Sequence, residues 1–182
     1  MTITAEELVA AATWVWHQDE KWGCQFLYPE GWYRFSFDDG REGVLYAPHP
    51  DDWATGFGVA VQDLGIEVTR EDLPDLEAGF REGLATLPGC QVAWLLHWQV
   101  EPSIILEAKC TFREGQATRQ RRSRLVYAGT RQFHVFAQGA TPKEFEQWRP
   151  LLYAMLMSFS VTRDQPGVAF EAEVEAEVGG AS

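Results

Sequence analysis

The sequence predicts an α+β domain in which amphipathic helices pack on an antiparallel sheet. Two observations support this fold class. Hydrophobic side chains recur at helical spacing in three segments, and from Cys90 to Gly139 they alternate with polar side chains at a period of two. The 182 residues suffice for one domain with its own core. The three cysteines are far apart and form no Cys-x-x-Cys pair, so we expect neither a disulfide framework nor a structural zinc site.

Each of the three helical segments has a start signal. Thr4 and Glu7 make a capping box, and the apolar spacing that follows predicts a helix over about residues 5–18. The clearest helix follows Thr69 and has one apolar stripe, formed by Leu73, Leu76, Phe80, Leu84 and Leu87. The last helix begins at Thr141 with a second capping box and is predicted to bury Phe145, Trp148, Leu152, Met155 and Leu156.

Turn residues divide the remaining apolar runs into strands. The Asp-Asp-Gly run at 38–40 predicts a hairpin, and the segment around Ile104–Phe112 places apolar side chains on one face and polar side chains on the other. These patterns predict strands at about 24–28, 33–37, 43–47, 57–62, 104–112, 119–128 and 131–138. The three strands after Cys90 form an antiparallel meander, which we expect to be the core sheet.

Composition suggests three parts: an N-terminal helical extension at 1–22, an α+β domain at 23–163 and an acidic tail at 164–182. In the tail, Glu alternates with apolar residues, which favours a strand or a disordered segment over a helix. The net charge of −12 is typical of a protein that binds no nucleic acid nonspecifically. No basic residue precedes Lys21, and the apolar run beside it is too short to span a bilayer, so we expect no export, no membrane insertion and a cytoplasmic location.

The order of these parts resembles the PsbP-like family. The resemblance rests on a "YPEGW" elbow at 28–32, a long amphipathic helix, the meander, and the stretch "ATPKEFEQWRPLLYAMLMSFSV" that closes on Ser158-Phe159; it covers about residues 24–161. This family shares its fold with a Ran-binding nuclear-import factor and several small bacterial proteins. The resemblance implies an antiparallel sheet with helices on both faces, a PsbP-like α/β/α sandwich. It also implies a binding or assembly subunit without catalytic residues, although many members carry a signal or lipoprotein sequence that this chain lacks.

The run His49-Pro50-Asp51-Asp52 follows a short apolar strand and resembles the first zinc motif of sugar N-deacetylases. A zinc hydrolase also needs a third protein ligand and a base beside the metal-bound water. The downstream histidines lie in predicted strands without a paired partner, and the fold of those enzymes is a doubly wound sheet. Proline and aspartate are also the residues that a turn requires. We therefore interpret this run as a turn and predict no metal site there.

Other chemical motifs are weak. Gly56–Val61 echoes Gly-x-Gly-x-x-Gly, but it lacks the third glycine and enters a strand instead of a helix, so no phosphate cradle and no cofactor is expected. No Gly-x-Ser-x-Gly elbow is present, and neither Ser103 nor Ser123 has a His and an acid partner that the sequence reveals. The sequence therefore predicts no catalytic residues.

The strongest charged feature is the run "RQRRSR", which predicts basic side chains on both faces of one strand. Three interpretations stay open: a solvated hairpin end whose charges discourage edge pairing, a docking site for an acidic partner or phosphate, or a counter-charge for the Glu-rich tail. Trp53 lies in a polar loop, and exposed tryptophans often anchor interfaces. The candidate partner-binding residues are Arg119, Arg121, Arg122, Arg124 and Trp53.

Together these observations predict a non-enzymatic domain that binds another protein or a second copy of itself, as an assembly factor or adaptor. Two alternatives come from other classes. One is a zinc-dependent hydrolase at the His49–Asp52 loop, and the other is a carrier of an apolar small molecule held between sheet and helix.

Overall fold

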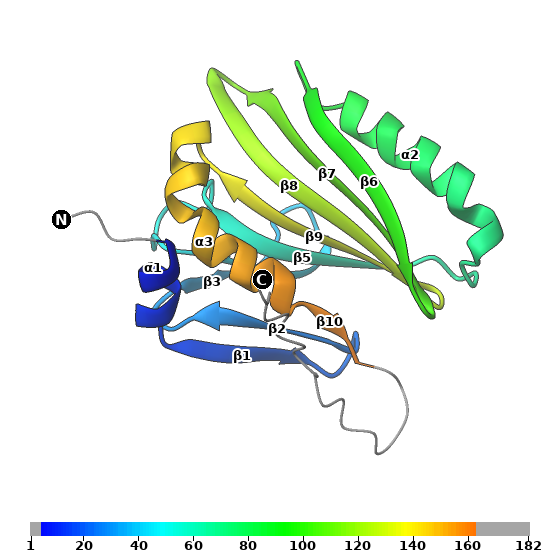
Figure 1. Ribbon diagram of the computed structural model, residues 1–182, viewed down its shortest axis with the longest axis horizontal. Coiled ribbons are helices and arrows are strands. Elements are labelled where there is room, and N and C mark those ends of the chain that lie inside the picture. Colours follow the sequence, from blue (N-terminus) through cyan, green and yellow to red (C-terminus); the bar gives the residue numbers. More distant parts are fainter. Residues whose placement is uncertain (1–4, 163–182) are drawn as a thin grey trace, which may run out of the picture.

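The computed structural model describes residues 5–162 and is built around a seven-stranded antiparallel sheet (Figure 1). Adjacent strands run antiparallel throughout. The α+β class and the antiparallel sheet are confirmed. Across the sheet the strands lie in the order β3 (Tyr33–Phe35), β4 (Glu42–Ala47), β5 (Gly56–Asp63), β9 (Arg131–Gly139), β8 (Ala117–Ala128), β7 (Ser103–Glu114) and β6 (Gln91–Val100).

The main core lies between one face of this sheet and helix α3 (Pro142–Ser158), which continues through Pro150. Thr141 caps α3 by accepting a hydrogen bond from the backbone N–H of Glu144, as the capping box predicts. A second, three-stranded sheet packs under α3 and consists of β1 (Trp14–Asp19), β2 (Cys24–Pro29) and β10 (Ser160–Val161). The buried side chains of this core include Phe26, Phe57, Phe133, Phe145 and Leu152.

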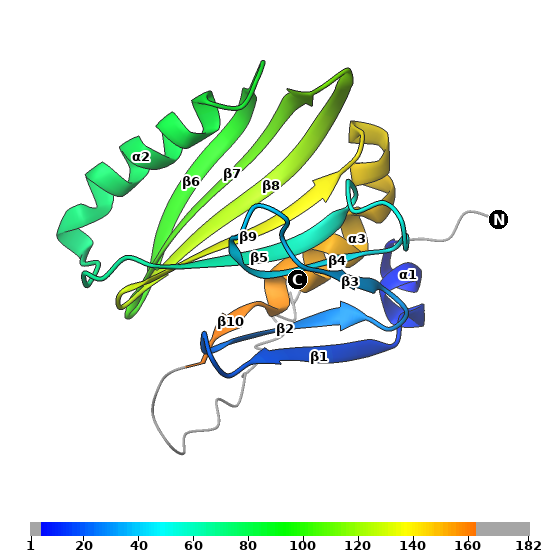
Figure 2. The ribbon, with the colours of Figure 1, turned by 180° about the vertical axis from the view of Figure 1, so that it is seen from behind.

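Helix α2 (Leu73–Ala85) lies on the opposite side of the seven-stranded sheet from α3, as both views show (Figures 1 and 2). A 3₁₀ turn, η1 (Arg70–Asp72), precedes α2. The predicted apolar stripe of α2 packs on β7 and β8 in a second core, whose most buried helix residues are Phe80 and Leu84. The sheet is therefore covered by a helix on each face, which confirms the sandwich.

The helix predicted over residues 5–18 is wrong beyond Ala11. Helix α1 (Ala5–Ala11) ends there, and β1 pairs with β2 along its whole length. The aromatic and β-branched residues of β1 favour a strand once a pairing partner is available, whereas the capping box marks only the start of a helix. Trp14 fixes the corner between the two elements, because its indole N–H donates to the backbone carbonyl of Val9 at 3.2 Å.

The hairpin between β7 and β8 sets which side chains reach each face. Gly115, at φ +60°, turns the chain, and the register places Glu107 opposite Arg124 and Ala108 opposite Ser123. Alternation then directs Arg122 and Arg124 toward the α3 side, while Arg121, Ser123 and Leu125 point to the α2 side. This is the division of faces that the strand pattern predicts.

Two predictions concern the two ends of the chain. The strand or disordered segment predicted for the acidic tail lies outside the described residues. The division at residues 22 and 163 stays a prediction, although the N-terminal strand β1 pairs with β2 of the main body. Within residues 5–162, no helix is both long and apolar enough to cross a membrane.

Candidate binding surfaces

The arginines of the basic run are engaged inside the protein. Glu107 is buried and accepts hydrogen bonds from the Nε of Arg122 and the Nε of Arg124, both at 2.5 Å. The two arginine side chains are only 18% and 10% exposed. Arg124 also donates to the carbonyl of Leu156 at 3.1 Å. These two charges are neutralised in part by one buried carboxylate and are not solvated at a hairpin end.

The other two arginines of the run also have internal contacts. Arg119 pairs with Glu114 at 2.9 Å and donates to the carbonyl of Ala140 at 2.9 Å. Arg121 donates from its Nε to the amide oxygen of Gln138 at 2.8 Å. The structure therefore contradicts the solvated interpretation of the run. Docking by the arginine run stays a prediction, and the tail as counter-charge lies outside the described residues.

The loop between β4 and β5 carries the other sequence candidates. Trp53 is 49% exposed, so it is accessible, and its role in partner binding stays a prediction. Asp52 accepts a hydrogen bond from the backbone N–H of Ala54 at 2.8 Å, which is the turn bonding expected of this run. His49 lies near Trp148, with 6.1 Å between ring centroids. In the described part of the chain, no three His, Cys, Asp or Glu side chains gather closely enough to hold a metal ion.

The last strand of the sheet, β6, pairs only with β7 among the described residues, so it is a long edge strand. Its ten residues, QVAWLLHWQV, include no Lys, Arg, Asp, Glu or Pro, and six of them are exposed. Natural edge strands are usually protected by charges, proline, bulges or a short length. Here the only such device is one register shift between Val92 and Trp94. Sequence analysis did not single out β6, but its lack of charge was a readable signal.

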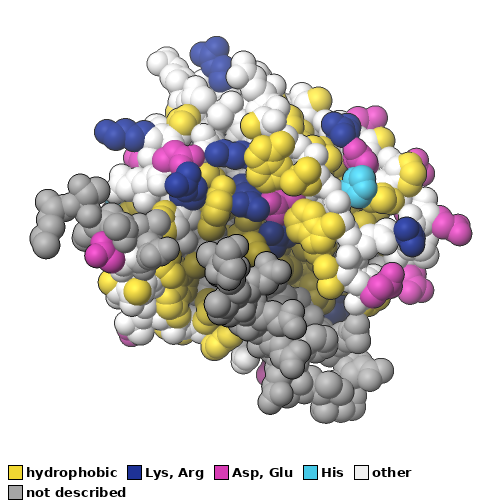
Figure 3. Space-filling view, viewed as in Figure 1, with side chains coloured by type: hydrophobic (Ala, Val, Ile, Leu, Met, Phe, Trp, Pro, Cys, Tyr) yellow, Lys and Arg dark blue, Asp and Glu magenta, His cyan; other side chains and the backbone are white. Residues whose placement is uncertain are grey.

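Apolar side chains line the α3 side of β6, and we call Trp94, Leu96, Trp98 and Val100 the β6 strip. Leu96 and Val100 are 56% and 59% exposed. The two tryptophans are held by the arginines, since Arg122 lies 5.3 Å from the ring of Trp94 and Arg124 lies 5.4 Å from that of Trp98. Figure 3 shows hydrophobic side chains gathered on this side of the molecule beside basic and acidic groups.

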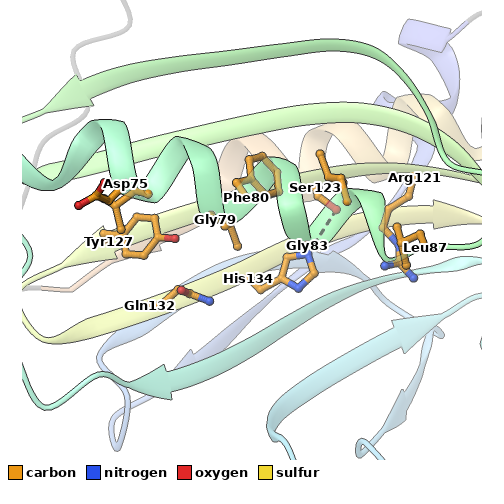
Figure 4. A pocket seen from close by; sticks show the side chains of 13 residues that line it. Asp75, Gly79, Phe80, Gly83, Leu87, Arg121, Ser123, Tyr127, Gln132 and His134 are labelled. Atoms are coloured by element: carbon orange, nitrogen blue, oxygen red, sulfur yellow. Dashed lines mark hydrogen bonds between the residues drawn. The ribbon is translucent and has the colours of Figure 1, made fainter.

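On the opposite face, α2 and the sheet enclose a groove of about 470 Å³, which we call the α2 groove (Figure 4). Apolar side chains from the helix form one wall, and polar side chains of β8 and β9 form much of the floor. Its lining residues are Asp75, Leu76, Gly79, Phe80, Gly83, Leu84, Leu87, Arg121, Ser123, Leu125, Tyr127, Gln132 and His134. This volume lies within the range of small-molecule sites.

The floor of the α2 groove brings together two residues that sequence analysis did not pair. The Nε2 of His134 and the Oγ of Ser123 are 3.3 Å apart. Burial, with the nearby charges of Arg121 and Arg41, lowers the pKa of His134 to about 3, which makes its imidazole a weak base. No carboxylate among the described residues contacts this ring, so the pair lacks the third group of a hydrolytic triad.

Comparison with known proteins identifies the fold. No family model matches the chain, and no curated protein matches it. Solved structures do match: the cyanobacterial PsbP protein CyanoP of Synechocystis sp. PCC 6803 has a TM-score of 0.59 at 13% identity, covering 82% of this chain and 93% of that one. The chain has a PsbP-like fold.

Two further proteins share the PsbP-like fold. LpqN of Mycobacterium tuberculosis, described as involved in cell envelope biogenesis, has a TM-score of 0.56 at 12% identity. The match covers 87% of this chain and 96% of the LpqN chain. The Ran-binding protein Mog1p of Saccharomyces cerevisiae has a TM-score of 0.50 at 9% identity, covering 83% and 96%. At such low sequence identities, the structural match establishes the fold and nothing more. The PsbP-like resemblance seen in the sequence is therefore confirmed for the fold.

Proposed function

We propose that this chain is a non-enzymatic protein-binding domain of the assembly or adaptor type, and that β6 is its contact strand. The observation that supports this most is the combination of a ten-residue free edge without charged side chains and an exposed apolar strip beside it. An edge of this kind presents unpaired backbone groups to another strand. One structural neighbour, Mog1p, is a Ran-binding protein, which is consistent with a binding role for this fold.

The partner that β6 fits best is a second copy of this chain. Antiparallel pairing about a twofold axis at His97 sets Leu96 of one copy beside Trp98 of the other. The same axis sets Trp94 beside Val100, so each apolar side chain meets another apolar side chain. A strand with several Lys or Glu residues would not satisfy this surface. In the pair, two seven-stranded sheets would continue as one.

The structure gives no support to the hydrolase alternative. His49 and Asp52 lie on an exposed loop, and Asp52 is used to hold the loop backbone. The neutral, weakly basic His134 beside Ser123 is likewise better suited to binding than to proton transfer. The carrier alternative is supported by the presence of the α2 groove, which lies on the other face of the sheet from the β6 strip.

Sedimentation velocity and native mass spectrometry of the full chain test the proposal. We expect a concentration-dependent dimer that becomes monomeric in Leu96→Lys, because each lysine would place its charge against an apolar partner. Ile66→Lys is the matched control, since Ile66 is 70% exposed but belongs to the loop between β5 and η1 and not to the β6 strand. Circular dichroism should show that both variants stay folded.

Two results would refute self-association through β6. One is a wild-type chain that stays monomeric at every concentration tested. The other is dissociation by Ile66→Lys or Trp53→Ala with no effect of Leu96→Lys, which would place the contact at a loop. If the chain is monomeric but pairs with a strand of a different protein, crosslinks from β6 to that strand would support protein binding and exclude self-association.

A further inference from the structure

The α2 groove is kept open by two glycines in the middle of a helix. Gly79 and Gly83 both line the groove, and a Cβ built on either one would have no heavy atom within 4 Å. Glycine in a helix interior is less favourable than almost any other residue. Close packing therefore does not explain glycine here, whereas an open groove does.

Arg121 supplies a second, independent observation. Its guanidinium lies against the rings of Phe112 and Phe136, at 4.7 and 5.1 Å, and bonds to the neutral amide of Gln138. Among residues 5–162, no carboxylate lies within ion-pair distance of it, unlike the neighbouring arginines that pair with Glu107 and Glu114. Glu114 acts on Arg121 only from beyond that distance, and a largely buried cation with no carboxylate in contact is costly, so a ligand carboxylate would stabilise it.

The groove is also polarised along its length. Figure 4 shows Arg121 beside Leu87 at one end, Asp75 with Tyr127 at the other, and Ser123 with His134 between them. The lining in the middle is apolar and consists of Phe80, Leu84 and Leu125, which belong to the second core and also line the groove. An anionic group is favoured only at the Arg121 end, since the carboxylate of Asp75 repels a second one at the far end.

We infer that the α2 groove binds a small molecule with one carboxylate and an apolar body, in which the carboxylate pairs with Arg121 and the body lies along Phe80, Leu84 and Leu125. Ser123 and His134 line the path between the two parts and offer hydrogen bonds without charge. His134 stays neutral there because its pKa is about 3. This site is separate from the protein contact proposed at β6.

Decanoate is a suitable probe, because it joins one carboxylate to an apolar chain. Titration of the full chain, followed by calorimetry and by amide shifts of Gly79 and Gly83, should show saturable binding at one site. Decanol lacks the charge, acetate lacks the apolar body, and decanedioate carries a second carboxylate toward Asp75. We expect each of the three to bind about ten- to a hundredfold more weakly, as loss of one charge-assisted bond or of the buried chain implies.

Two variants separate binding from folding. Gly83→Leu fills the groove with a good helix former, so it should abolish decanoate binding while the thermal midpoint stays equal or rises. Ala78→Leu, on the same helix but outside the groove lining, is its control and should bind like wild type. Arg121→Gln should remove the preference for decanoate over decanol, whereas Arg149→Gln on α3 should keep it.

The inference is overturned if decanoate shows no saturable binding, if decanol binds wild type as tightly as decanoate does, or if Gly83→Leu binds decanoate normally. Binding of acetate with the strength of decanoate would reduce the groove to a plain anion site and also contradict it. If Arg121→Gln fails to fold, the Gly83→Leu and Ala78→Leu pair still decides the question.

Discussion

Glu107 on β7 and Arg124 on β8 face each other across neighbouring strands, with 2.5 Å between the carboxylate Oε2 and the guanidinium Nε. Glu107 is 1% exposed and also binds Arg122, so one buried carboxylate serves two guanidinium groups. Arg122 and Arg124 in turn support the rings of Trp94 and Trp98 in the β6 strip. These buried charged side chains therefore connect the core of the sheet to the proposed contact surface at the β6 strip.

We predict that Glu107→Gln destabilises the protein by about 3–5 kcal/mol, because two buried arginines lose their counter-charge. Urea unfolding followed by circular dichroism measures the change. The matched control is Glu146→Gln on α3, whose side chain is 43% exposed and pairs with Arg149 at 2.6 Å; it should cost less than about 1 kcal/mol. Equal costs for the two variants would show that the Glu107 cluster is no stronger than a surface pair.

A second prediction concerns the pH dependence of stability. Burial, with the charges of Arg121 and Arg41, lowers the pKa of His134 to about 3 from its usual 6.5. The unfolded chain therefore takes up a proton at this residue before the folded one does, so its contribution to stability is complete above pH 6.5. That contribution is lost as the pH falls toward about 3, by at most about 1.4 kcal/mol per pH unit.

The carboxylates of the protein also titrate in this range, so the measurement is a difference. Urea unfolding of wild type and of His134→Gln should be measured at neutral pH and at several pH values below 6.5. The difference in unfolding free energy between the two proteins should change as the pH falls. Wild type should lose more stability than the variant on acidification. A constant separation, or an NMR titration of the His134 ring close to its usual pKa, would contradict the prediction.

The fold could be predicted from the sequence wherever its cause was local. Capping residues, turn residues and the alternation around Ile104–Phe112 act within a few positions, and they located α2, α3 and the meander correctly. The start of the chain failed because β1 owes its structure to pairing with β2, as between Trp16 and Leu27, and such pairing leaves no local mark.

The solvated interpretation of the basic run was wrong for the same reason, whereas partner binding by these arginines and by Trp53 stays a prediction. The run at Arg119–Arg124 looked solvated because its partner Glu107 lies seventeen positions away from Arg124 and meets it only through strand register. Ser123 and His134 are likewise brought together by the register of β8 and β9. Local composition reports charge, whereas burial and pairing depend on which strands become neighbours.

The last prediction concerns Ser158, which ends α3 in the Ser-Phe pair that helped to identify the fold. Its Oγ accepts a hydrogen bond from the backbone N–H of Leu27 and donates one to the carbonyl of Met155, both at 2.8 Å. Ser158→Ala would leave the Leu27 N–H without this partner, so we expect a loss of about 1–3 kcal/mol in unfolding free energy. Hydrogen exchange at Leu27 should accelerate as well. Ser160→Ala, at an exposed position of β10, should change stability by less than about 0.5 kcal/mol; if it matches Ser158→Ala, the link between α3 and β2 does not depend on this hydroxyl.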